Sequence, residues 1–189
     1  MSYLYDIDEC LKVLKNGGLI LYPTDTVWGI GCDATNEVAV EKIYTLKNRN
    51  EKKSMIILVA AENEIMHYSN QDSFTIFNYI KGIHKPVTVI YNEAKNLAKN
   101  LINADGSVGI RIVKDKFCRQ LITLFGKPIV STSSNVSGYP PPTIFNDIDI
   151  KIKSGVDYIV QHRQDDFEIA EPSTVVKIND TGEIIILRP

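Results

Sequence analysis

The stretch LILYPTDTVWGIGCD, residues 19–33, decides how the rest of the sequence is interpreted. Its first four residues, Leu19–Tyr22, form a short apolar run that is typical of a buried strand. Pro23 has no backbone N–H to donate, so the strand is predicted to end there. The hydroxyls of Thr24 and Thr26 then follow a strand end, which is where α/β proteins usually place ligands. Thr and Asp also favour a capped turn for purely local reasons, so both interpretations stand at this point.

The composition predicts an ordinary globular protein. The chain has 189 residues, which is enough for one domain with a substantial core, and we expect a single domain, 1–189. The formal net charge of −2 argues against a general nucleic-acid coat. Cys10, Cys32 and Cys118 are widely spaced and odd in number, as expected for reduced thiols of a cytoplasmic protein. No signal peptide and no run of membrane-spanning length is found, so no membrane partner is expected.

Helical and strand patterns alternate along the chain, which predicts a mixed sheet of an α/β protein. Thr174–Ile178 and Glu183–Leu187, separated by turn residues 179–182, predict a hairpin near residue 189. Asp6 is expected to cap the first helix, and Thr143 is placed to cap a later one. The expected helices are Asp6–Asn16, Glu37–Lys47, Glu62–Tyr68, Ser73–Lys81 and Lys116–Phe125. The expected strands are Leu19–Tyr22, Met55–Ala60, Val87–Tyr91, Val108–Val113 and Pro128–Val130.

Cations occur at two places where a ligand could use them. Lys47, Arg49 and Lys53 form a basic cluster after a predicted helix. Such a cluster can clamp a phosphate or carboxylate, but it also stabilises a helix C-terminus or forms a solvated face. Arg111 lies inside an apolar strand, on the face that begins with Gly109. A charged strand residue is usually paired or exposed, and the glycine is expected to permit close approach of a ligand.

A loop rich in hydroxyl and amide side chains follows the predicted strand that ends at Val130. It reads STSSNVSG, residues 131–138, and offers Ser131, Ser133 and Asn135 as phosphate-binding groups. It is also an ordinary composition for a turn. Neither a GxxxxGK[ST] loop nor a GxGxxG motif is present. Further along, Ser173 and Thr174 precede the predicted hairpin and Arg188 closes it.

Taken together, these segments resemble the YrdC-type L-threonylcarbamoyladenylate synthase family. Their order and separations agree across almost the whole chain. The matching segments are YPTDTVWGIG (22–31), K-x-R (47–49), VGIR (108–111), SSNVSG (133–138), PT (142–143), PSTVV (172–176) and LR (187–188).

The resemblance implies a single YrdC-like catalytic domain with a twisted mixed parallel and antiparallel sheet, flanking helices and a large open cavity. It implies a nucleotidyltransferase that makes L-threonylcarbamoyl-AMP from L-threonine, bicarbonate and ATP, with Mg²⁺ accompanying the ATP. Pyrophosphate is the other product. The adenylate would serve the threonylcarbamoyl modification of a tRNA adenosine, through tRNA contact and a separate threonylcarbamoyl transferase complex.

The motifs and their chemistry assign roles to individual residues. No protein ligand for a metal is assigned. Lys47 and Arg49 are expected to be catalytic. Threonine and bicarbonate are expected at Thr24, Thr26, Lys47, Arg49, Ser173 and Thr174. The nucleotide is expected at Lys53, Arg111, Ser131, Ser133, Asn135 and Arg188.

The chain also departs from the family pattern. The position after Arg49 is Asn50, where the family has proline, and the histidine usual after the strand arginine is missing. Lys114 stands where it could replace the positive charge of that histidine. Two alternatives therefore remain open: a non-catalytic RNA-binding module of the same fold, and a divergent carbamoyl or nucleotidyl transferase.

Overall fold

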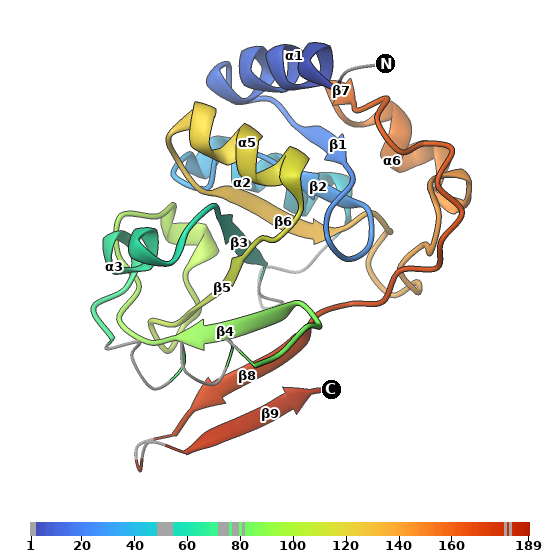
Figure 1. The fold of residues 1–189 in the computed structure, drawn as a ribbon. Coiled ribbons are helices and arrows are strands. Elements are labelled where there is room, and N and C mark those ends of the chain that lie inside the picture. Colours follow the sequence, from blue (N-terminus) through green and yellow to red (C-terminus); the bar gives the residue numbers. More distant parts are fainter. Residues whose placement is uncertain are drawn as a thin grey trace.

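The computed structural model describes residues 3–48, 55–71, 76, 80, 82–179, 181 and 183–189 (Figure 1). The helices are α1 (Leu4–Lys15), α2 (Glu37–Leu46), α3 (Ile65–Tyr68), α5 (Lys116–Phe125) and α6 (Ile150–Ser154), with the short 3₁₀ helices η1 (Glu62–Glu64), η2 (Lys99–Leu101) and η3 (Phe145–Asp147). The strands are β1 (Ile20–Tyr22), β2 (Gly29–Gly31), β3 (Ile56–Val59), β4 (Val87–Tyr91), β5 (Val108–Ile112), β6 (Ile129–Ser133), β7 (Tyr158–Ile159), β8 (Thr174–Ile178) and β9 (Ile184–Arg188).

The strands of the described residues form one twisted sheet in the order β7-β1-β2-β6-β3-β5-β4-β8-β9. Strands β1 and β7, β3 and β5, and β4 and β8 pair in parallel, whereas the remaining neighbours are antiparallel. This confirms the mixed sheet and the hairpin β8–β9 that the sequence predicts. The buried apolar side chains of both halves of the sheet belong to one continuous cluster.

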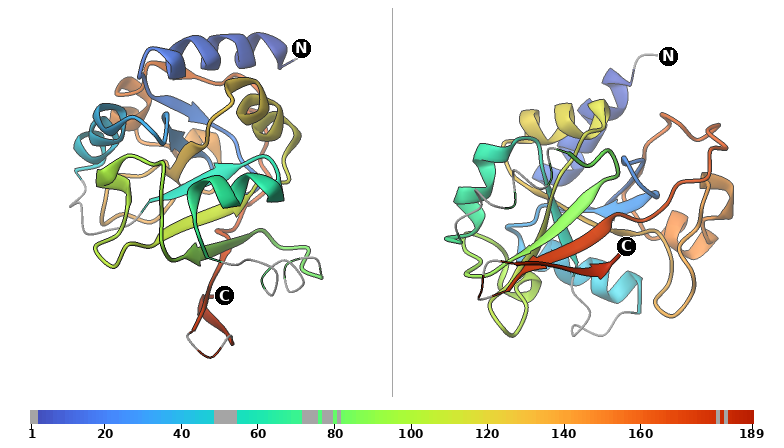
Figure 2. Two further views of the ribbon diagram at one scale, coloured as in Figure 1. Left: turned by 90° about the vertical axis from the view of Figure 1, so that its left-hand side faces the viewer. Right: turned by 60° about the horizontal axis from the view of Figure 1, so that its bottom comes forward.

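Helices α1 and α5 lie side by side over one face of the sheet (Figures 1 and 2). Helix α5 begins because the Asp115 side chain accepts a hydrogen bond from Cys118 N at 2.8 Å. It ends at Gly126, whose φ of 73° is the left-handed conformation that favours glycine. Its buried face, which includes Phe117 and Leu121, packs toward the core. In the described part of the chain, every helix is too short or too polar to span a lipid bilayer.

The two predicted helix caps are wrong. Helix α1 begins at Leu4, without a side-chain cap, because the apolar repeat extends one turn earlier than expected. Asp6 is buried instead, and its carboxylate accepts hydrogen bonds from Tyr158 Oη at 2.7 Å and from the backbone N–H groups of Gln161 and His162. Asp149, rather than Thr143, caps the helix that follows the polar loop. The predicted helix Ser73–Lys81 lies largely outside the described residues.

One long connection ties the two ends of the sheet together. Residues 160–173, called the crossing segment below, leave β7 at one end and reach β8 near the other (Figures 1 and 2). The crossing segment carries no helix or strand. Arg163 of this segment contacts Thr24, and Ser173 at its end lines the same cavity as Thr26. This connection closes one side of the cavity described next.

Candidate active site

The turn after β1 supplies the first group of polar side chains. Thr24 Oγ1 donates to Val27 O at 2.9 Å, accepts from Thr26 N at 3.0 Å and lies 3.0 Å from Thr26 Oγ1. Thr24 is therefore fully engaged within the turn, and its side chain is buried. Thr26 lines the cavity, whereas Thr24 stands behind it and fixes it. The two interpretations of this segment, a capped turn and a turn that faces a ligand, therefore describe the same turn.

Arg111 enters the same region from β5, a strand flanked by β3 and β4. Its side chain is buried and Nη2 lies 3.2 Å from Asp25 Oδ1 and 3.5 Å from Thr24 Oγ1. Asp25 Oδ2 accepts from the backbone N–H of Lys114 at 3.0 Å. Nε of Arg111 is buried and has no hydrogen-bond partner in the described part of the chain.

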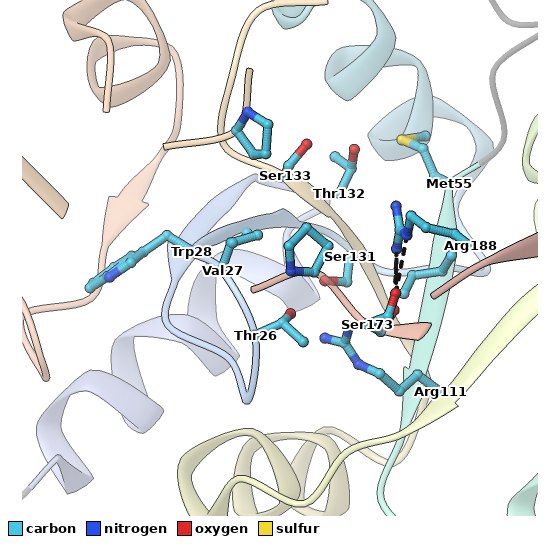
Figure 3. Close-up of a pocket in the computed structure, with 14 residues that line it drawn as sticks. Thr26, Val27, Trp28, Met55, Arg111, Ser131, Thr132, Ser133, Ser173 and Arg188 are labelled. Carbon is cyan, nitrogen blue, oxygen red and sulfur yellow. Dashed lines mark hydrogen bonds between the residues drawn. The ribbon is translucent and has the colours of Figure 1, made fainter. Parts of the chain in front are cut away.

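Arg188, from the last strand, supplies a second guanidinium group. Its Nε and Nη2 donate to Ser173 O at 3.1 and 2.9 Å, and Ser173 Oγ lies 2.8 Å from Thr88 Oγ1. Desolvation lowers the pKa of Arg188, and the positive charge of Arg111 lowers it further. Figure 3 shows Arg111 and Arg188 on either side of Ser173. Because two cations repel one another across the same space, an anion bound between them would stabilise both.

These groups surround a cavity of about 270 Å³ (Figure 3). Its walls combine the two arginines, the hydroxyls of three segments and a small apolar surface. Trp28 lies at the side away from the arginines and packs on Phe145, with ring centroids 4.8 Å apart. The lining residues are Thr26, Val27, Trp28, Gly29, Met55, Ile56, Arg111, Ser131, Thr132, Ser133, Pro141, Pro172, Ser173 and Arg188.

The residues of the predicted hydroxyl-rich loop line two different cavities. Ser131 and Ser133 lie on β6 and line the cavity with the arginines. Asn135 does not; it lines a neighbouring cavity of about 480 Å³, and its Nδ2 donates to Tyr139 O at 2.6 Å. Pro141 belongs to both linings and forms their common wall. The strand thus extends further into the polar sequence than predicted.

Lys47 is buried beneath this loop, with 1% of its surface exposed. Its Nζ donates to Ser133 O and, at 2.6 Å, to Asn135 O. Its backbone carbonyl accepts from Ser137 N at 2.9 Å. The ammonium group therefore holds the backbone of the 133–137 loop in place. Sequence reasoning predicted a cation near the substrate but gave no indication of these loop carbonyls.

Other predicted positions are distributed as follows. Thr174 is half-buried at the start of β8 and its N–H donates to Pro86 O at 3.0 Å. Arg49 and Lys53 lie outside the described residues. Lys114 does not replace the missing histidine, because its Nζ donates to Ile83 O at 2.9 Å and to His84 O at 3.4 Å, and it is not among the lining residues.

Two groups at the site were missed from the sequence or given another role. A methyl group on Gly109 would lie 2.8 Å from Ile56 Cγ2, so this glycine makes room for a strand neighbour rather than for a ligand. Asp25, which the sequence indicates only as a turn residue, forms the ion pair with Arg111. Its position directly after Thr24 was the feature of the sequence that could have indicated a place at the site. A carboxylate next to a buried arginine is needed to offset the cost of desolvating that charge.

Comparisons with known proteins agree with this geometry. Residues 12–189 match a family model, Sua5/YciO/YrdC, described as "Telomere recombination". A Methanocaldococcus jannaschii protein with the provisional name threonylcarbamoyl-AMP synthase is 33% identical over 177 residues, covering 94% of this chain and 82% of its own. A Psychromonas ingrahamii protein named threonylcarbamoyl-AMP synthase is 36% identical over 135 residues, which cover 70% of this chain and 71% of the relative.

Solved structures share the fold. Pyrococcus abyssi Sua5 superposes with a TM-score of 0.87 at 23% identity, covering 98% of this chain and 56% of the longer Sua5 chain. Escherichia coli YciO gives a TM-score of 0.83 at 21% identity, covering 97% and 88%. These similarities confirm the YrdC-like architecture, and the family model extends over both walls of the cavity. This chain belongs to the Sua5/YciO/YrdC family.

Proposed function

We propose that this protein synthesises L-threonylcarbamoyl-AMP from L-threonine, bicarbonate and ATP, with release of pyrophosphate. The observation that supports this most strongly is the pair Arg111 and Arg188, which face one cavity together with hydroxyls from three segments. The relatives named threonylcarbamoyl-AMP synthase align with most of the chain. All three proposed substrates carry negative charge, and guanidinium groups bind carboxylates and phosphates in a planar fork.

The amino acid is proposed to bind between the Thr24 turn and Ser173. Thr26 offers a hydroxyl at the cavity surface, and Ser173 offers another on the opposite wall. Thr24 acts from behind by fixing Thr26, and Thr174 acts by starting the strand that holds Ser173. Arg49 remains our proposed contact to bicarbonate and the reacting carboxylates, and Lys47 is proposed to act in catalysis through the loop that it holds. The structure supports Lys47 in a positioning role, since its ammonium holds the loop next to Ser133.

The nucleotide is proposed to lie along β6. Ser131 and Ser133 present hydroxyls to the phosphates, and the guanidinium group of Arg111, which lines the same cavity, supplies positive charge there. The remainder of the nucleotide would pass Pro141 into the neighbouring cavity, which Asn135 lines. Lys53 is the further proposed cation, after the 47–49 cluster. Arg188 would neutralise charge that develops on the phosphates.

The reaction needs no covalent enzyme intermediate. The threonine amine attacks the bicarbonate carbon, and loss of water gives a carbamate. A carbamate oxygen then attacks the α-phosphorus, forming the carbamoyl–phosphate anhydride while the bond to pyrophosphate breaks. The residues align the reactants and offset their charges, which is where most of the acceleration of such reactions arises. The apolar wall around Trp28 and Met55 limits access of water to the unstable carbamate.

Mg²⁺ is proposed to arrive with ATP. Within the described ranges, no group of three or more His, Cys, Asp or Glu side chains is arranged to hold a metal ion. The hydroxyls and carbonyls around β6 are hard oxygen donors, which suit a Mg²⁺ ion that keeps its phosphate ligands and several waters. When bound, Mg²⁺ would screen the phosphate charges during attack on the α-phosphorus.

The product is proposed to leave for a separate threonylcarbamoyl transferase complex that modifies a tRNA adenosine, with direct tRNA contact as a further proposal. A cytoplasmic location is proposed with it. The cysteines Cys10, Cys32 and Cys118 are free and buried, as thiols in a reducing compartment commonly are.

Steady-state pyrophosphate release tests the proposal. Release is expected only when ATP, L-threonine and bicarbonate are all present. A divergent transferase would release pyrophosphate without threonine or without bicarbonate. A non-catalytic RNA-binding module would bind RNA and release none. Either result would replace the proposed activity with the corresponding alternative.

A further inference from the structure

Arg163 has an unusual backbone conformation beside the candidate active site. It lies in the crossing segment with a φ of 66°, in the left-handed region that residues with a Cβ rarely adopt. Such a conformation persists where surrounding contacts determine it, and it is concentrated at functional sites. The contacts of the Arg163 side chain therefore need an explanation.

The guanidinium group of Arg163 joins three segments. Its Nη1 donates to Thr24 O at 3.1 Å and lies 3.5 Å from Asp115 Oδ2. Its Nε donates to Asp166 Oδ2 at 3.1 Å. Asp115 caps α5, and Asp166 lies in the same turn as Arg163. Only a planar fork with several fixed N–H directions meets these three oxygens at once.

The residues between β5 and α5, together with the first turn of α5, also hold the Thr24 turn. Cys118 Sγ donates to Pro23 O at 3.2 Å, and Lys114 N donates to Asp25 Oδ2 at 3.0 Å. Arg163 adds a contact from the crossing segment, which ends at the cavity-lining residue Ser173. Arg163 thus connects the Thr24 turn, which carries Thr26, to the segment that leads to Ser173.

We propose that Arg163 is a positioning residue: it holds the Thr24 carbonyl so that the Thr26 hydroxyl faces the cavity, and it anchors the crossing segment that places Ser173 opposite. It does not touch the cavity itself, because it is absent from the lining residues. This inference rests on the proposed function, since the amino-acid substrate is placed between the Thr24 turn and Ser173. The contrasting interpretation is a surface ion-pair network that contributes only to stability.

The test uses Arg163→Gly, Arg163→Lys and the control Lys85→Ala. Glycine removes the fork but suits a positive φ, so the backbone conformation is retained. Lysine keeps the charge and loses the fork. Lys85 Nζ lies 3.4 Å from Glu171 Oε2, so the control breaks an exposed ion pair of the crossing segment that does not include the Thr24 turn.

Arg163→Gly is expected to raise KM for threonine about tenfold, because small misplacement of a binding group is costly. KM for ATP should change by less than about twofold, since β6 is untouched. Arg163→Lys should give an intermediate KM for threonine, and Lys85→Ala should match wild type. An unchanged KM for threonine in both Arg163 variants, or equal losses in Lys85→Ala, would overturn the proposal.

Amide hydrogen exchange provides a readout that does not depend on the activity. Arg163→Gly is expected to increase exchange of residues 24–29 several-fold, while the core of α5 keeps its protection. Unchanged exchange across residues 24–29 would contradict the positioning role even if KM shifted. If wild-type protein releases no threonine-dependent pyrophosphate, the proposed function fails, whereas the exchange comparison still decides the role of Arg163.

Discussion

Replacing Lys47 with methionine removes an ammonium group but keeps much of the buried volume. The Lys47 side chain is 1% exposed, and its Nζ donates to Ser133 O and Asn135 O. A hydrogen bond to a charged group contributes about 1.5–3 kcal/mol. Two such hydrogen bonds set the loss in free energy of unfolding at about 3–6 kcal/mol. The lower end applies because the loop can move so that its carbonyls reach water. We therefore expect Lys47→Met to lower the free energy of unfolding by about 3 kcal/mol, or roughly 6–12 °C in Tm for a chain of this size.

The same substitution should lower turnover more than stability alone explains. At a temperature where the variant is folded, displacement of the 133–137 loop should reduce kcat/KM by about 30- to 1,000-fold, equivalent to 2–4 kcal/mol of transition-state stabilisation. Lys42→Met is the matched control. Lys42 lies on α2, the helix that ends just before Lys47, and its Nζ donates to Gly17 O at 2.7 Å, away from the cavity. Because Lys42 is exposed, the control should lose little stability and keep turnover. Wild-type Tm in Lys47→Met, or equal turnover losses in both variants, would refute the reasoning.

Three further outcomes follow from the same structure. Wild-type protein should reject valine strongly, because valine would leave a hydroxyl of the site unpaired, and Thr26→Val should weaken this discrimination between threonine and valine. Serine lacks only one methyl group of threonine, so its kcat/KM with wild type should fall by only about 1–3 kcal/mol, measured by pyrophosphate release. Ser133→Ala should weaken ATP binding in calorimetry with little change in Tm, since the Ser133 side chain lines the cavity rather than the core; unchanged affinity and kinetics would make Ser133 structural. Burial raises the pKa of the thiols of Cys10, Cys32 and Cys118. Native thiols therefore stay protonated while unfolded ones ionise above about pH 8.5, so stability is full below that pH and falls above it by up to about 1.4 kcal/mol per pH unit for each thiol. Between about pH 8.5 and 10, below the range in which unfolded tyrosines ionise, Cys32→Ala should reduce the alkaline slope of urea-unfolding free energy by about one third, and an unchanged slope would contradict this assignment.

The strands that the sequence predicted well are those with continuous apolar runs. Val87–Tyr91 and Val108–Val113 appear as β4 and β5 because both faces of these strands are covered. Strand β2 was missed because Gly29–Gly31 has only one side chain to show a pattern. A methyl group on Gly31 would lie 2.7 Å from Tyr22 Cε1, so glycine is required there by close packing. Local propensity cannot reveal a requirement imposed by a neighbouring strand.

At the site, the sequence predicted residue types better than their roles. Arg111 and Arg188 were identified from their motifs, and both line the cavity. That Lys47 would be bonded to loop carbonyls could not be predicted, because its partners are 86 and 88 residues away in sequence. Arg163 gave no signal at all, since a positive φ and a contact to Thr24 depend on how the crossing segment is closed. Non-local hydrogen bonds are the part of the site that one sequence does not disclose.

Mass spectrometry of the product formed from ATP, L-threonine and ¹³C-labelled bicarbonate tests the central claim most directly. The proposed reaction predicts an adenylate that contains threonine together with the labelled carbon, formed in equal amount to pyrophosphate. The label distinguishes this product from a simple threonyl adenylate, in which the threonine carboxylate itself has attacked the α-phosphorus. An unlabelled threonyl adenylate, or pyrophosphate release without any threonine-containing product, would contradict the account.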